Sequence, residues 1–369
     1  MIAEDLLMPL TPLGERQNLR RYLLTEVEDF DIATLATLTT DAWAHDYVDQ
    51  LRINLDTHHL QHMLSGDDWF AIVVCDERDT PVGFEIAMGR TVYCRGDVFT
   101  GYYVSAFTVA STHRRRGIGQ WVLEGINEVA FESRGADLLF SAFHRGMAGS
   151  PTVQSTFDKM ADFGVTRFHR SANYGVRVDR DPPPNVTMPL SVTRVTSTGD
   201  GWQHHVESEA AGPIDIPSLS AFDAHIRDHY DVGFALDKSF QGHYLSAEQD
   251  DGVMLWVGFD NGAKACVSYA ITPLIVNDRV LKPSGMIQAV SQQGCSNDQL
   301  EQMMLALAHR FRELGCLAIS LYDLGVIPMS VIDNLRLNAD DEFDYAVRGP
   351  RAVIEQFEGV QSPFYVDLT

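Results

Sequence analysis

The sequence has 369 residues, enough for two domains of average size, and its composition (45% hydrophobic, 21% charged) is that of a globular protein. A formal net charge of −23 argues against a nucleic-acid partner, because neutralising phosphates requires a basic surface. No apolar run approaches the roughly 20 residues of a membrane-spanning helix, and the first residues lack a secretory signal. We therefore expect a cytoplasmic protein that does not act at a membrane.

The cysteines and histidines do not predict a metal site or a disulfide framework. The cysteines are five in number, and no two of them form a Cys-x-x-Cys pair. His58 and His62 are one helical turn apart, a spacing that binds metals, but no third ligand lies near them in the sequence. We expect buried free thiols and no metal cofactor. The cysteines are Cys75, Cys94, Cys266, Cys295 and Cys316.

The first elements of the chain alternate between strand and helix patterns. Residues 19–27 predict a strand, and residues 31–43 predict a helix with Asp31 as its N-cap. A short helix is expected over residues 56–66. Residues 68–89 contain two apolar runs around a polar turn, which predicts a hairpin.

The next elements continue the alternation up to the middle of the chain. An apolar strand is expected over residues 101–111, and a helix with one apolar face over residues 119–135. A buried strand follows at 136–143, then a helix at 150–164, and a last strand at 165–178.

Three consecutive prolines at 182–184 block both helix and sheet pairing, and they predict a linker over residues 181–190. This linker separates an N-terminal domain, residues 1–180, from a C-terminal domain, residues 191–369. The two halves have similar lengths, and the second repeats the order of elements of the first, which indicates an internal duplication.

The second half is expected to contain the following elements. They are a strand at 192–195, helical pieces at 201–212 and 218–230, a hairpin at 253–271, a strand at 285–294, a helix at 296–315, a strand at 316–324, a helical or irregular segment at 328–343, and a strand-like end at 362–369.

Three consecutive arginines in an acidic chain mark the junction between the strand at 101–111 and the following helix. The sequence there is Arg114-x-x-Gly117-x-Gly119. Glycines before a helix allow a phosphate to approach the free N–H groups of the first helical turn, and the helix dipole favours a negative charge. Adjacent guanidinium groups add full positive charge. A ligand with several phosphates fits this junction best.

The junction does not match two common nucleotide-binding patterns. A dinucleotide-binding fingerprint requires a third glycine where Val122 stands, and a Walker loop requires a Gly-Lys-Ser/Thr sequence that is absent here. Instead, it resembles the acetyl-CoA signature of the GNAT superfamily of N-acetyltransferases, Arg/Gln-x-x-Gly-x-Gly/Ala, and the flanking elements follow the family order over residues 15–178. The resemblance implies an α/β (α+β) fold of two tandem GNAT-like domains, each a mixed, mostly antiparallel sheet flanked by helices.

The resemblance also implies acetyl-CoA, or another acyl-CoA, as the co-substrate. By analogy with the family, backbone N–H groups of the loop grip the pyrophosphate, and the segment Phe107–Val109 pairs with the pantetheine arm. The implied cofactor-binding residues are Phe107, Thr108, Val109, Arg114, Arg115, Arg116, Gly117, Ile118, Gly119 and Gln120.

The resemblance does not supply a catalytic acid, because the position of the usual tyrosine of the family holds Met160 here. Ser155, Thr156 or Asp158 nearby, Tyr174, His144 or solvent remain as proton donors. Tyr103 occupies the position of the basic glutamate of some family members, and Ser105 shares its strand face. Glu85 is the one carboxylate in the run of residues 83–89, and either a site role or a solvent-facing position would explain it. The candidate catalytic residues are Glu85, Tyr103, Ser105 and Ser155.

The family lines its acceptor site with the early helical region. Trp43 and Tyr47, together with His144, are therefore candidate substrate-binding residues. The second half retains the strand–turn–helix outline, but at the place of the loop it carries residues 291–297, with one glycine and no arginine. We expect a degenerate GNAT-like domain that shapes the acceptor pocket and does not bind CoA in the usual way.

These observations predict transfer of an acyl group, most simply acetyl, from acyl-CoA to the amine of a small molecule such as a specialised metabolite or a resistance substrate. The alternatives are an enzyme similar to mycothiol synthase, a protein or peptide N-acetyltransferase, and a non-catalytic CoA-binding sensor. The expected assembly is a monomer or a homodimer.

Overall fold

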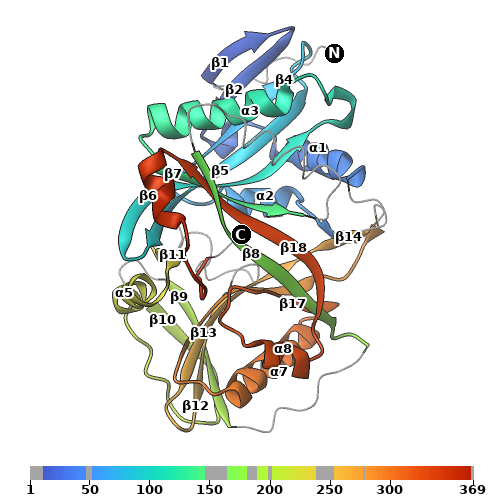
Figure 1. Ribbon diagram of the computed structural model, residues 1–369. Coiled ribbons are helices and arrows are strands. Elements are labelled where there is room, and N and C mark those ends of the chain that lie inside the picture. The colour runs from blue at the N-terminus through green and yellow to red at the C-terminus, as the bar shows by residue number, and fades with distance from the viewer. Residues whose placement is uncertain are drawn as a thin grey trace.

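The computed structural model describes residues 11–46, 52–145, 164–180, 189–197, 202–237, 253–276 and 279–366. Among them, one mixed, mostly antiparallel sheet of fifteen strands runs through both halves of the chain and is flanked by helices (Figure 1). This architecture confirms the predicted fold class. No helix within the described ranges has the length and apolar character needed to span a membrane.

The first half contributes one end of the sheet and the helices that cover it. Its strands are β1 (Thr11–Arg16), β2 (Leu19–Leu24), β4 (Trp69–Cys75), β5 (Pro81–Cys94), β6 (Asp97–Val109), β7 (Leu138–His144) and β8 (Gly164–Arg177), with β3 (Arg52–Ile53) in a small separate sheet. Its helices are η1 (Val27–Asp29), α1 (Ile32–Ala44), α2 (Thr57–Met63), η2 (Ser111–His113) and α3 (Ile118–Asn127), which continues as η3 (Glu128–Ser133).

The second half contributes the other end of the sheet and the helices beside it. Its strands are β9 (Leu190–Ser197), β10 (Trp202–Glu209), β11 (Val232–Phe234), β12 (Val253–Phe259), β13 (Lys264–Thr272), β14 (Leu274–Val276), β15 (Arg279–Val280), β16 (Ser284–Gln293), β17 (Ala318–Tyr322) and β18 (Asn338–Gly349). Its helices are α5 (Leu219–His229), α7 (Asn297–Glu313), α8 (Met329–Asn334), α9 (Arg351–Ile354) and η4 (Glu355–Phe357).

The two halves exchange strands at the middle of the sheet. The order there is β7-β18-β8-β17, so β18 of the second half lies between two first-half strands, and β8 lies between two second-half strands (Figure 1). Both β18 and β8 are antiparallel to their neighbours along most of their length. The predicted boundary at residues 181–190 therefore divides the sequence but does not divide the sheet.

A repeated unit supports the duplication expected from the order of elements. Strands β6 and β7 are parallel over Gly101–Val104 and Leu138–Ser141, and α3 connects them. Strands β16 and β17 are parallel over Ser284–Ile287 and Ala318–Leu321, and α7 connects them. The crossover helix lets each pair run in parallel, since parallel strands need a long connection.

Two second-half segments differ from the prediction. Residues 201–212, predicted to be helical, contain the edge strand β10, which pairs with β9. Trp202 and Val206 are four residues apart, as on a helix face, but backbone pairing with β9 decides the conformation. Residues 328–343, predicted to be helical or irregular, contain α8 and the start of β18, whose polar residues form a strand because they pair with β8.

Two predicted elements, at 150–164 and 362–369, can be compared with the structure only in part. The predicted helix at 150–164 lies outside the described residues except for Gly164, which begins β8. In the predicted terminal strand, Tyr365 forms a single parallel bridge with Gly233.

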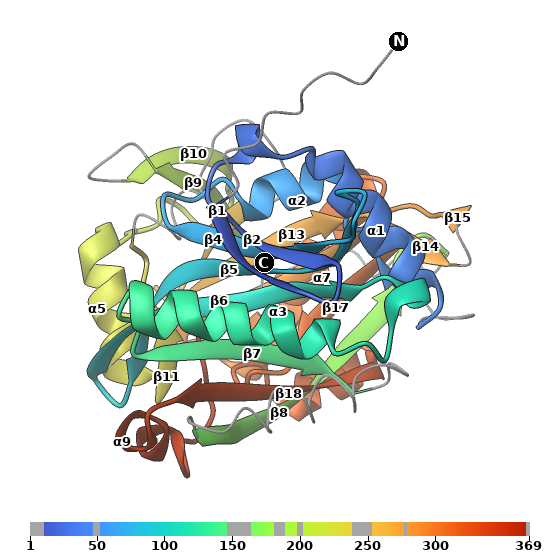
Figure 2. The same ribbon diagram turned by 90° about the horizontal axis from the view of Figure 1, so that it is seen from above.

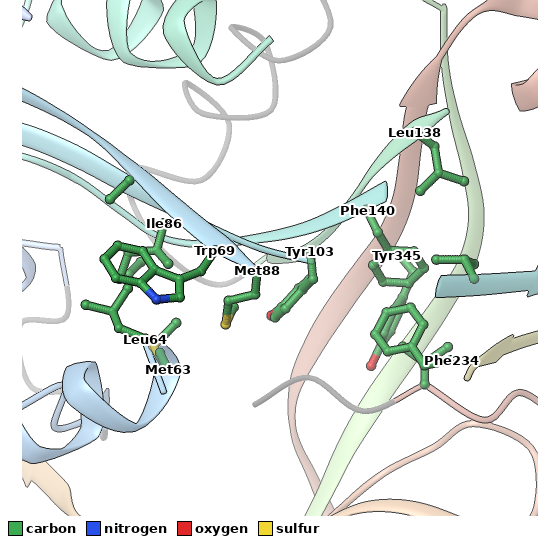
Figure 3. Packing of buried hydrophobic residues seen from close by; sticks show 14 of the residues in the cluster. Met63, Leu64, Trp69, Ile86, Met88, Tyr103, Leu138, Phe140, Phe234 and Tyr345 are labelled. Carbon is green, nitrogen blue, oxygen red and sulfur yellow. The ribbon is translucent and has the colours of Figure 1, made fainter. Parts of the chain in front are cut away.

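The largest hydrophobic core is built from both halves. Phe140 of β7 is fully buried, and its ring contacts Tyr103 of β6, Phe234 of β11 and Tyr345 of β18 (Figure 3). It also contacts Phe168 of β8. The ring centroids lie 5.0–6.3 Å apart, the usual range for edge-to-face packing. Because these rings come from both halves, the two halves should unfold together.

Phe140→Ala should lower the free energy of unfolding by about 3–5 kcal/mol, because it leaves a cavity among four aromatic rings. Urea unfolding followed by circular dichroism and by tryptophan fluorescence should show one coincident transition. Val98→Ala, at a side chain that is 55% exposed, is the control and should change stability by less than about 0.5 kcal/mol. Two separated transitions would contradict a shared core.

Candidate functional site

Strands β6 and β7 separate at one end of their parallel pairing. Their pairing ends at Val104 and Ser141; beyond it β6 continues along β5, and β7 continues along β18. A bulge in β6 lies directly after the separation, where Ala106 has a φ of 59°. Within the described residues, the segment from Ser105 to Val109 therefore has a ladder partner on one side, β5, and none on the other.

The loop from β6 to α3 presents backbone N–H groups at the end of the sheet where β6 and β7 separate. Gly117 is the N-cap of α3, with a φ of 75° and no side-chain capping bond, and Arg115 has a φ of 63°. The Trp121 N–H donates to the Gly117 carbonyl, so the N–H groups of residues 118–120 precede the first intrahelical bond. Such a turn at a helix N-terminus favours an anion.

The two glycines of the loop have different roles. Gly117 needs the left-handed conformation, which costs an L-residue with a side chain roughly 1–2 kcal/mol, although a Cβ there would meet no atom within 4 Å. Gly119 allows close packing instead, since a Cβ there would lie 2.8 Å from the Phe107 Cζ atom. Together they place the start of α3 directly against the end of β6, as Figure 2 shows from above.

The three arginines do not share one environment. Arg114 forms a bidentate ion pair with Asp46, with Nη1 to Oδ1 at 2.8 Å and Nη2 to Oδ2 at 2.9 Å, and Nη2 also donates to the Ala42 carbonyl at 3.1 Å. Arg115 and Arg116 are exposed and make no hydrogen bond or ion pair with any residue that the structure describes. These two guanidinium groups are therefore the ones positioned to meet an anion from solution.

The corresponding helix of the second half is built differently. Gly294 precedes α7 with a φ of 69°, but Ser296 caps the helix through its side chain, and Gln299 completes a capping box by accepting from the Ser296 N–H. The N-terminal N–H groups of α7 are thus partly satisfied by the chain itself. This arrangement favours an anion at α3 over one at α7.

Glu85 is a buried carboxyl group rather than a solvent-facing one. It is 4% exposed and lies opposite Ile72 of β4, whose side chain packs in the core beneath α3. Its Oε2 atom has no hydrogen-bond partner among the described residues. Burial raises the pKa of Glu85 to about 8, although the charge of Arg348 lowers it.

Tyr103 and Ser105 lie on the opposite side of the sheet from Glu85. Tyr103 is 5% exposed and packs in the core that α1 covers, next to Phe140 (Figure 3). Ser105 is half-buried and pairs with Ile86, which belongs to that same core. Thr108, by contrast, uses its hydroxyl to donate to the Ala106 carbonyl within the bulge.

The candidate acceptor residues are only partly described. Trp43 of α1 is half-buried and packs against the core that contains Tyr103. His144 of β7 lies 2.9 Å from the Asp341 carboxylate of β18, through its Nε2 atom. Tyr47, Ser155 and Met160 lie outside the described residues.

No group of three metal-ligating side chains occurs within the described ranges. His58 and His62 of α2 line a cavity of about 30 Å³ together with residues of the second half, including Pro273. Asp46 could not be found from the sequence, because nothing in the sequence indicates that it pairs with an arginine 68 residues away.

The chain has the fold of the GCN5-related (GNAT) acyltransferases, here in a tandem arrangement. Searches with protein-family models and against curated proteins found no match.

Solved structures that resemble the chain over most of its length support this fold. A putative acetyltransferase from Pyrococcus horikoshii is 14% identical, with a TM-score of 0.56, and the match covers 96% of this chain and 95% of that one. Saccharomyces cerevisiae N-myristoyltransferase with bound myristoyl-CoA and inhibitors is 11% identical, with a TM-score of 0.66, covering 92% and 81%. The glucosamine N-acetyltransferase region of a fungal multi-domain GH3 β-N-acetylglucosaminidase is 13% identical, with a TM-score of 0.58, covering 89% and 38%.

Glu85→Gln should flatten the pH dependence of stability between about pH 4.5 and pH 8. The folded-state pKa of about 8 lies above the ordinary value of 4.5, so folding favours the protonated carboxyl group. Its contribution to stability is complete below pH 4.5 and is lost as the pH rises through 8. Urea unfolding at about pH 5 and about pH 8.5 should show a larger loss of stability in the wild type than in the variant. Glu77→Gln, at an exposed turn, is the control, and an unchanged slope in Glu85→Gln would refute the assignment.

Proposed function

We propose that this protein is an acyl-CoA-dependent N-acyltransferase that transfers an acyl group, most simply acetyl, to the amine of a small molecule. The observation that carries this proposal is the N-terminus of α3. It is uncapped by any side chain, opens on Gly117, is flanked by the exposed Arg115 and Arg116, and lies where β6 and β7 separate.

The cofactor would lie along the separation of the two strands. The N–H groups of residues 115–120 would bind the diphosphate of acyl-CoA, helped by the charges of Arg115 and Arg116. The pantetheine arm would pair with the unpaired side of Phe107–Val109, in the manner of an added strand. A backbone N–H at the bulge would polarise the thioester carbonyl.

In the reaction, the amine nitrogen attacks the thioester carbonyl, the carbon–sulfur bond breaks, the nitrogen releases a proton and the CoA sulfur gains one. Tyr103 and Ser105 are proposed to face the amine, because they lie on the side of the sheet that α1 and Trp43 cover. Glu85 lies on the side of α3, and its buried carboxyl and Ser155 remain candidates for proton transfer.

The second half is proposed to close the acceptor site. Phe234, Tyr345 and Phe364 pack in the same core as Tyr103, so second-half residues cover this face of the first-half sheet. A covered face suits a small amine better than a protein substrate. The capped start of α7 supports a role for the second half in shaping the pocket rather than in binding CoA.

Gly117→Ala should weaken binding of acetyl-CoA by about five- to thirtyfold, because strain of roughly 1–2 kcal/mol would distort the loop. Gly294→Ala is the matched control: its φ is also positive, a Cβ there also meets no atom, and it precedes α7. Isothermal titration should show near wild-type affinity for the control. Equal losses in both variants, or no binding in the wild type, would contradict the proposed site.

Turnover can be followed through the thiol that the reaction releases. Acetyl-CoA with a panel of small amines, aminosugars and peptide N-termini should yield free CoA in a thiol-specific dye assay for at least one small amine. A peptide as the only acceptor would favour a protein N-acetyltransferase. Binding without turnover on any amine would favour a CoA sensor. Faster release from myristoyl-CoA would contradict a short acyl group.

A further inference from the structure

The Arg114 side chain points away from the open loop and toward the end of α1. Its guanidinium group donates to both oxygens of Asp46 and to the Ala42 carbonyl, at distances from 2.8 to 3.1 Å. The Asp46 side chain is only 12% exposed, so the pair is partly shielded from water. A bidentate pair of this kind is both stronger and more directional than a single contact between surface charges.

The ion pair lies at the start of the loop between β6 and α3, where it can fix one end of the loop. Arg114 directly precedes Arg115, whose left-handed conformation is unfavourable for any residue with a Cβ, and Gly117 is left-handed as well. Such a loop keeps its shape only if both of its ends are fixed. On one side, Ile118, the first residue of α3, is buried against the sheet with an exposure of 2%; on the other side, Arg114 is held by the end of α1.

The contact also gives a hydrogen-bond donor to a backbone carbonyl group in the last turn of α1. The carbonyl groups of the last helical turn have no intrahelical partners, and a cation there interacts favourably with the helix dipole. Arg114 supplies both a donor and a charge at that point. Helix α1 in turn packs on β5 and β6 and carries Trp43, so the pair joins the loop to the helix that covers the Tyr103 side of the sheet.

We propose that Arg114 and Asp46 form a positioning pair that holds the phosphate-binding loop in shape and couples it to α1, and that Arg114 does not contact the phosphates of CoA. This inference rests on the proposed function. It gives the three arginines different roles: Arg114 holds the loop in shape, whereas Arg115, Arg116 and the backbone contact the phosphates. It also assigns a role to Asp46, a carboxylate that a phosphate ligand would otherwise repel.

Two substitutions distinguish a positioning pair from a phosphate ligand by the direction of their effects. If Arg114 positions the loop, Asp46→Asn and Arg114→Met both break the ion pair, and each should weaken CoA binding by about three- to tenfold. Arg114→Met also removes the bond to the Ala42 carbonyl, so the double variant should be no weaker than Arg114→Met alone. If Arg114 were a phosphate ligand restrained by Asp46, Asp46→Asn would release it, and CoA affinity would stay unchanged or rise. That outcome would overturn the proposal.

The salt dependence of CoA binding gives a second readout that a general loss of stability would not alter. The double variant Asp46→Asn/Arg114→Met, which removes both charges of the pair, should weaken binding by the same factor at low and high salt, because no contact with phosphate is lost. Arg116→Gln should weaken binding mainly at low salt, because screening already reduces its contribution at high salt. Arg114→Lys, which retains the charge but lacks the fork of donors, should restore only part of the affinity. A loss in the double variant that disappears at high salt would contradict the proposal.

Asp68→Asn is the matched control. It breaks another ion pair of the first half, Arg134 Nη1 to Asp68 Oδ1 at 2.6 Å, away from the loop, and should leave CoA affinity near the wild-type value. Thermal unfolding of every variant checks that folding is retained. Failure of the wild type to bind CoA would refute the proposed function itself, whereas binding that is insensitive to both Asp46→Asn and Arg114→Met would refute only the positioning pair.

Discussion

Hydrogen bonding on both edges of β18 is the constraint on which the rest of the architecture depends. This strand joins β7 on one side to β8 on the other, and β8 in turn joins the strands of the second half. A strand in the interior of a sheet leaves no unpaired backbone groups, so the exchange fixes the two halves as one sheet. It also fixes where β7 must run after it leaves β6, and this produces the separation at Val104 and Ser141.

The two halves show how the same topology can have different chemical properties. Each contains a parallel strand pair joined by a helix, and in each a glycine with positive φ precedes that helix. In the first half, no side chain caps α3, and two exposed arginines flank its start. In the second half, Ser296 and Gln299 cap α7. A few residues at a helix N-terminus thus decide whether its N–H groups meet a ligand or the chain itself.

The sequence was sufficient for features that depend on neighbours along the chain. The strand at 101–111, the loop with Gly117 and Gly119, and the helix after it could be predicted because turn geometry and helix initiation are local properties. The partner of Arg114 could not, because Asp46 is brought to it only by the packing of α1 on β6. The strand character of β18 and β10 was missed because it comes from backbone pairing, with the distant β8 in the case of β18 and with the neighbouring β9 in the case of β10. Roles for Glu85, Tyr103, Ser105 and Ser155 stay predictions, since the pattern of one chain does not show where a substrate lies.

The central claim is that the start of α3, and not the start of α7, binds the diphosphate of an acyl-CoA. A crystal structure of the protein with acetyl-CoA tests it most directly. The account predicts diphosphate oxygens within hydrogen-bonding distance of the N–H groups of residues 118–120, with the pantetheine arm beside Phe107–Val109 and Arg114 still paired with Asp46. A cofactor bound at α7, or a complex in which the start of α3 stays empty, would contradict it.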